Sequence, residues 1–117
     1  MKLVYASSGE SIERLVKNLK LNDVLKLSSG NEEVDDEFIL LTYNEDEGEI
    51  PTIVKNFLDN NAFLCSGVYT VDNILEHPYT FNSASSKIEE EYDLEILGKF
   101  DDDGDDEDTI EAILKSF

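Results

Sequence analysis

The apolar residues of this chain follow two alternating patterns. Five short apolar runs have the length of buried strands and predict strands at Leu3–Tyr5, Val24–Leu27, Phe38–Tyr43, Phe63–Thr70 and Leu94–Leu97. Four other segments repeat apolar residues at helical spacing, within residues 12–19, 50–58, 81–92 and 110–117. Polar loops rich in Ser, Gly, Asn and acidic residues separate these segments. The predicted order of elements is therefore β-α-β-β-α-β-α-β-α.

This order predicts an α/β fold. Strands that alternate with helices form a parallel sheet, so we expect a doubly wound, five-stranded parallel sheet with helices on both faces. The polar stretch 28–37 takes the place of a helix between the second and third strands. A length of 117 residues fits one domain spanning residues 1–117. Doubly wound sheets bind ligands beyond the carboxyl ends of their strands. We therefore expect a binding edge formed by loops 6–11, 43–49 and 71–79.

The charge of the chain limits its partners. It carries 28 acidic against 9 basic residues, for a formal net charge of −19. This balance argues against direct binding to nucleic acid or to anionic membrane surfaces, because both need clustered Lys and Arg. It favours a basic partner. No apolar run approaches the length of a membrane span, and Met1–Tyr5 has no cleavage-site pattern. We therefore expect a cytoplasmic protein.

Residues that often carry chemistry are few. Cys65, the single cysteine, lies in a predicted strand and is interpreted as a small buried hydrophobe. His77, the single histidine, stands beside a proline in a loop, where it is either solvated surface or part of a ligand-binding edge. It has no second histidine with which to build a metal site. The acidic stretch 101–108 is not an EF-hand loop, because Lys99 falls at the first ligand position when counted from Gly104. We interpret it as a solvated loop leading into the last helix.

The loop after the first strand contains Ser7, Ser8, Gly9, Glu10 and Ser11 and leads into a helix. Backbone N–H groups at a helix N-terminus bind phosphate without any basic side chain. Serine hydroxyls add donors, and glycine lets the backbone approach a ligand closely. The same residue types also cap ordinary helices. The pattern thus supports either a phosphate site or a helix cap.

A strand followed by a Ser/Gly loop resembles the phosphate loop of flavodoxins. The strand Phe38–Tyr43, followed by a polar loop with Gly48 and Pro51, resembles more specifically the NrdI family. This resemblance continues in order through the residues Gly67, Val68, Asn73, Phe81, Ile88, Tyr92, Ile96, Leu97, Lys99, Phe100 and Gly104. It covers nearly the whole chain and implies a flavodoxin-like fold.

Members of that family hold FMN and work beside class Ib ribonucleotide reductase. Their reduced flavin converts dioxygen to an oxidant that activates the dimanganese site of the small reductase subunit. The resemblance therefore implies FMN as cofactor, the reductase small subunit as partner, and an electron donor that it does not identify. The protein would be a redox accessory protein rather than a stand-alone enzyme.

The resemblance also assigns site residues. Ser7, Ser8, Gly9 and Ser11 would hold the FMN phosphate, with Glu10 in the same loop. One side of the isoalloxazine would be lined by Thr42, Tyr43, Asn44, Glu45 and Gly48. The other side would be lined by Asp72, Asn73 and the loop through His77. Tyr43 and Tyr79 fall in loops at the binding edge and could stack on a flat ring.

Two departures from the family pattern keep a second function open. Ser8-Gly9-Glu10 stands where the family usually has Thr-Gly-Asn, and a carboxylate at Glu10 repels a phosphate unless it points away. The third loop is not glycine-rich, unlike that of the family. The alternative is a cofactor-free acidic module that docks on a basic protein surface or imitates DNA.

Overall fold

The computed structural model describes residues 1–45, 48–73, 76, 79–80, 82–101 and 106–117. The strands are β1 (Lys2–Tyr5), β2 (Val24–Lys26), β3 (Phe38–Tyr43), β4 (Cys65–Asp72) and β5 (Ile96–Asp101). The helices are α1 (Glu10–Leu19), α2 (Thr52–Asn61), α3 (Ser83–Tyr92) and α4 (Asp106–Leu114), and a 3₁₀ turn, η2 (Ala62–Leu64), follows α2. This sequence of strands and α-helices confirms the predicted order.

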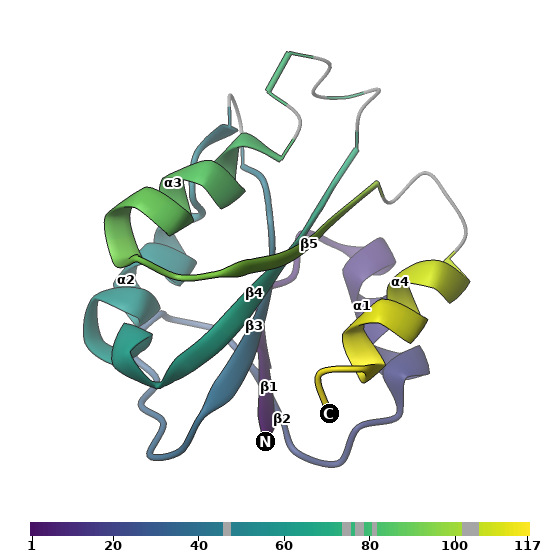
Figure 1. The fold of residues 1–117 in the computed structure, drawn as a ribbon, viewed down its shortest axis with the longest axis horizontal. Helices are drawn as coiled ribbons and strands as arrows, with labels where there is room; N and C mark the ends of the chain where they lie inside the picture. Colours follow the sequence, from purple (N-terminus) through teal and green to yellow (C-terminus); the bar gives the residue numbers. More distant parts are fainter. Residues whose placement is uncertain (46–47, 74–75, 77–78, 81, 102–105) are drawn as a thin grey trace.

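The strands form one parallel sheet in the order β2-β1-β3-β4-β5. Helices α2 and α3 cover one face, and α1 and α4 cover the other, as Figure 1 shows. The doubly wound α/β prediction is therefore confirmed. Strand order reverses between β1 and β3, because the chain moves from β1 outward to β2 and then returns to the other side of β1. Reversal points of this kind are where open α/β sheets bind ligands.

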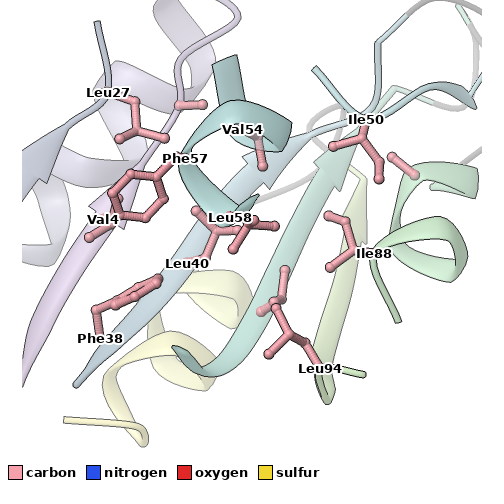
Figure 2. Packing of buried hydrophobic residues seen from close by; sticks show 13 residues of the cluster. Val4, Leu27, Phe38, Leu40, Ile50, Val54, Phe57, Leu58, Ile88 and Leu94 are labelled. Atoms are coloured by element: carbon pink, nitrogen blue, oxygen red, sulfur yellow. The ribbon is translucent and has the colours of Figure 1, made fainter. Parts of the chain in front are cut away.

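The α2–α3 face of the sheet packs into the apolar cluster drawn in Figure 2. Phe38 of β3 meets Phe57 of α2 edge to face, with ring centroids 5.3 Å apart. Both rings are fully buried, as is Ile88 of α3. Burial of each such side chain contributes roughly 1.5–3 kcal/mol, so these contacts fix α2 and α3 against the sheet. The helical repeat seen in the sequence is the face that makes these contacts.

The opposite face is closed by α1 and α4. Ile12 and Leu15 of α1 and Ile113 of α4 pack on β1, β3 and β4. Tyr69 of β4 donates its hydroxyl hydrogen bond to the Ala112 carbonyl at 3.0 Å, which ties α4 to the sheet. Acidic residues Asp106, Glu107 and Asp108 occupy the first turn of α4, where they complement the helix dipole as predicted. The first part of the acidic stretch, residues 102–105, lies outside the described residues.

The limits of β4 and β5 differ most from the sequence prediction, while those of β1 and β2 differ by one residue. Phe63 does not belong to a strand but to η2, where it is 82% exposed, and β4 begins at Cys65. The last strand begins at Ile96 rather than Leu94 and continues to Asp101. Backbone pairing decides these limits, because Val68 pairs with Ile96 and Asp72 with Asp101. Apolarity alone does not encode that register.

Cys65 begins β4 and is half-buried. Burial raises the pKa of its thiol to about 11, and this outweighs the hydrogen bonds from backbone groups of Gly67 and Leu40 that lower it. The thiol therefore stays protonated at neutral pH, as expected for a packed rather than a reactive cysteine. Separately, no helix in the described part of the chain is long and apolar enough to cross a membrane.

The loop after β2 is organised around one carboxylate, that of Glu32. It accepts hydrogen bonds from the backbone N–H groups of Ser28, Ser29 and Gly30 at 2.7, 3.1 and 2.8 Å, and from the Ser28 hydroxyl at 2.9 Å. Partial burial raises the pKa of Glu32, but these hydrogen bonds outweigh it and lower the pKa from 4.5 to about 2. The folded chain therefore stabilises the ionised form of Glu32 relative to the unfolded chain.

We expect Glu32→Gln to lower the free energy of unfolding at pH 7 by about 1–2 kcal/mol, because the amide replaces a charged acceptor at a solvent-accessible site. In the wild type this contribution is present above pH 4.5 and is lost as the pH falls toward about 2, since the folded-state pKa is depressed. Urea unfolding between pH 2 and 7 measures both effects. Glu33→Gln, at the exposed neighbouring position, is the control. Equal stability of the two variants across this range would contradict the prediction.

Candidate functional site

The carboxyl ends of the parallel strands place three loops at one edge of the molecule. Residues 6–9 connect β1 to α1, residues 44–51 connect β3 to α2, and residues 73–82 connect β4 to α3. The first two flank the point where strand order reverses. The three loops predicted for the binding edge therefore follow strands β1, β3 and β4, which are neighbours in the sheet.

The first loop makes a tight turn at the start of α1. Gly9 is the N-cap residue, with φ of 150°, and no side chain caps the helix. Of the two interpretations that the sequence left open, the helix cap is met here only by the glycine of the loop and not by a serine side chain. Ser7 instead stabilises the turn, because its Oγ accepts from the Gly9 N–H at 3.2 Å and donates to the Gly9 carbonyl at 3.1 Å. A Cβ added at Gly9 would meet nothing within 4 Å, so the backbone here is open to close approach.

A pocket of about 540 Å³ opens beside this turn. Its volume lies within the range of ordinary small-molecule sites. It is lined by Ala6, Ser7, Ser8, Gly9, Glu10, Glu13, Lys26, Leu27, Tyr43 and Ile53. The pocket thus brings together the β1–α1 loop, the end of β2 and the end of β3. Of the predicted site residues, it gathers Ser7, Ser8, Gly9, Glu10 and Tyr43.

Two charged residues in this pocket were not predicted from the sequence. Lys26 ends β2, and its Nζ lies 2.6 Å from Oε1 of Glu13 on α1. This contact with the Lys26 ammonium is the main reason that the pKa of Glu13 is lowered, and it raises the pKa of Lys26. Tyr5 of β1 also donates to Glu13, at 3.3 Å. The sequence did indicate that both residues lie near the first loop. Lys26 lies near the end of a predicted strand at the binding edge, and Glu13 lies one helical turn after Glu10.

The loop after β3 is held by Asn44, which is buried. Its Nδ2 donates to the Thr80 carbonyl at 3.1 Å, and its Oδ1 accepts from the Ala84 N–H at 2.8 Å. Gly48 in the same loop has φ of 85°, and a Cβ there would lie 2.6 Å from Cβ of Ser83. These contacts tie the second loop to the segment that leads into α3.

Asp72, at the end of β4, holds the third loop in a similar way. Its Oδ2 accepts from the Asn82 N–H at 2.8 Å and its Oδ1 from the Asn73 N–H at 2.8 Å. Nearby buried polar groups are less satisfied, since the Thr70 hydroxyl and the Asn82 side-chain amide have no hydrogen-bond partner in the described structure. Asn44 and Asp72 therefore order the second and third loops through their own side chains.

The remaining predicted site residues occupy different environments. Thr42 is fully buried, Glu45 is exposed, and Tyr79 is 98% exposed. Ser11 lies in the first turn of α1, and Asn73 directly follows β4. His77 lies outside the described residues.

Tyr43 is half-buried at the end of β3 and is one of the residues that line the pocket. Burial, and to a lesser extent the charge of Glu45, raises the pKa of its hydroxyl. Tyr43 is therefore neutral at physiological pH.

Comparison with known proteins identifies the family. The family described as "NrdI Flavodoxin like" matches residues 3–114. Protein NrdI of Bacillus licheniformis is 32% identical over 101 residues, which cover 86% of this chain and 76% of that protein. This chain belongs to the NrdI family.

Solved structures show the same fold at lower identity. A flavodoxin of Streptococcus pneumonia TIGR4 superposes on the NrdI-family chain with a TM-score of 0.61 at 22% identity, covering 97% of this chain and 92% of the other. Oxidised Flavodoxin 2 from Bacillus cereus gives a TM-score of 0.60 at 17% identity, covering 99% of both chains. The flavodoxin-like fold predicted from the resemblance is confirmed.

In this NrdI-family protein, we expect Asn44→Ala to lower the free energy of unfolding by about 1–3 kcal/mol, because it leaves the buried Thr80 carbonyl and Ala84 N–H without their partner. Urea denaturation measures the change. Asn60→Ala is the matched control, since Asn60 is exposed and makes only a 3.4 Å bond within α2. Equal effects of the two substitutions would show that Asn44 does not hold the loops.

Proposed function

We propose that this protein binds FMN at the β1–β3 edge and transfers electrons in support of class Ib ribonucleotide reductase. The single observation that carries the proposal is the pocket, which joins the β1–α1 turn to the ring of Tyr43 at the reversal point of the sheet. Family membership supports the same cofactor, because the resemblance to NrdI proteins implies FMN.

The first loop fits a phosphate. Backbone amides at the N-terminus of α1, together with the hydroxyls of Ser7 and Ser8, supply donors without requiring a cluster of cations. Gly9 leaves open space where a side chain would otherwise stand. Glu10 lines the pocket and is exposed, so its carboxylate has to turn toward solvent when a phosphate binds. In the proposed complex, Ser7, Ser8, Gly9 and Ser11 hold the phosphate.

The rest of the pocket fits a flat, mostly apolar ring. Tyr43, Leu27 and Ile53 present aromatic and aliphatic surface. In the proposed complex, Tyr43 stacks on the ring while Asn44, Glu45 and Gly48 form one side; Thr42 is fully buried behind them and offers the ring no surface. Asp72, Asn73 and Tyr79, with His77, form the other side. When bound, the reduced flavin supplies the electrons that convert dioxygen to the oxidant for the dimanganese centre.

The protein's contribution is to position and enclose that cofactor. Asn44 and Asp72 hold the two ring-side loops by hydrogen bonds within the chain, which limits the loop movement needed on binding. The net charge of −19 favours a basic docking surface on the reductase small subunit and on the electron donor, and it speeds their encounter. The cytoplasm is the proposed location.

A second function, a cofactor-free acidic docking module or DNA mimic, is favoured by one observation. The carboxylates of Glu10 and Glu13 both line the pocket and oppose an anion there. A protein that stays colourless with flavin yet inhibits a DNA-binding enzyme would support this alternative.

The apoprotein is expected to bind one FMN and to quench its fluorescence, and to bind riboflavin at least about tenfold more weakly, because riboflavin lacks the phosphate that the α1 turn recognises. Isothermal titration and fluorescence titration measure both affinities. Lumichrome, which lacks the ribityl phosphate chain, serves as a ring-only control. Equal affinities for FMN and riboflavin would contradict the assigned phosphate site, and no binding of any flavin would remove the electron-carrier function.

Reduced, flavin-loaded protein with dioxygen is expected to raise the activity of a manganese-loaded class Ib small subunit from the same genome. An equal concentration of free reduced FMN is the control for flavin chemistry in solution. An assay of deoxyribonucleotide formation measures the effect. Activation no greater than with free FMN would contradict the proposed partnership, whatever the flavin titration gives.

A further inference from the structure

We propose that Lys26 binds the terminal phosphate dianion of the flavin nucleotide, and that in doing so it exchanges Glu13, its partner in the free protein, for the phosphate. This inference rests on the proposed FMN function and adds a specificity-determining ion pair to it. The ligand recognised is a phosphate monoester, and the consequence is selection of a phosphorylated flavin over a neutral one.

The fold places Lys26 next to the phosphate loop. Lys26 is the last residue of β2 and pairs in the sheet with Tyr5, the last residue of β1, from which the Ser7–Gly9 turn begins. Lys26 lines the same pocket as that turn, and it is the only cationic residue among those that line it. Its ammonium group is therefore the nearest positive charge that the described pocket wall offers to an anion.

The Lys26–Glu13 ion pair is weak enough to change partners. The side chains are 55% and 41% exposed, so water screens the pair and it adds little to stability. A phosphate dianion carries more charge than a carboxylate and forms stronger, charge-assisted hydrogen bonds. The lysine ammonium has three donors on a flexible stem, so it can turn from the carboxylate to a phosphate without moving the strand.

Glu13 does not lose all its partners when Lys26 moves. The Tyr5 hydroxyl donates to Oε2 of Glu13 at 3.3 Å. Because this hydrogen bond remains, the exchange does not leave a bare carboxylate facing the phosphate. Without Lys26, however, the charges of Glu13 and Glu10 oppose the anion.

The experiment measures FMN and riboflavin affinities of the apoprotein for paired variants. Lys26→Met is expected to weaken FMN binding about tenfold or more while leaving riboflavin binding unchanged. Lys26→Arg keeps the charge and is expected to retain most of the FMN affinity. Glu13→Gln frees the lysine and removes a repulsive charge, so FMN binding should tighten several-fold and riboflavin binding should not. Inorganic phosphate is expected to compete with FMN for the site, and its affinity should change from variant to variant in the same order as the FMN affinity.

Lys2 and Asp23 provide matched controls, since they form an ion pair at the opposite end of the same two strands. Lys2→Met changes the net charge as Lys26→Met does, and Asp23→Asn changes it as Glu13→Gln does. Both controls should leave the ratio of FMN to riboflavin affinity unchanged. The role of Lys26 is overturned if Lys26→Met leaves FMN affinity intact, or if it weakens FMN and riboflavin equally. A wild type that prefers FMN no more than riboflavin also overturns the role of Lys26, whereas a wild type that binds no flavin overturns the proposed function itself, so the two failures are distinct.

Discussion

The central strands of this protein are apolar on both sides, and this constraint determines the rest of the architecture. Leu40 of β3 faces α2 and α3, while Leu41 faces α1 and α4, and both are fully buried. A sheet with two apolar faces must be covered twice, so the chain has to cross over the sheet with helices on either side. Because every strand is parallel, these crossovers return all strands to the same carboxyl edge. The loops of the candidate site meet there as a result of core burial.

The site at that edge works with little positive charge. The chain has 9 basic residues against 28 acidic ones, and within the described structure several of its lysines are paired with surface carboxylates. In the proposed complex the N-terminus of α1 attracts the phosphate without a cluster of basic side chains, and Lys26 is the cation of the described pocket wall that adds to it. The same acidity leaves the outer surface suited to basic partners. Cofactor binding and partner recognition can therefore rest on opposite electrostatic requirements within one small domain.

Short polar side chains couple the loops that flank the pocket. Asn44 joins the β3 loop to the start of α3, and Asp72 joins the end of β4 to the same segment. Both are buried, so their hydrogen bonds are shielded from water and are costly to leave unmade. Glu32 organises the loop after β2 in a comparable way, with its own carboxylate bound by backbone amides. In each case one side chain replaces a longer or more regular connection.

The sequence by itself determined the order of elements, the parallel two-sided sheet and the serine–glycine turn at the start of α1, because periodicity and turn chemistry are local properties of the chain. It could not determine the limits of β4 and β5, since these depend on which residues pair across the ladder. Nor could it bring Lys26 to Glu13, or Asn44 to Ala84, because those contacts join segments that are distant in sequence. Such contacts form only when the helices pack on the sheet. For that reason the turn that is proposed to hold a phosphate could be recognised from its residues, whereas the ion pair beside it required the folded structure.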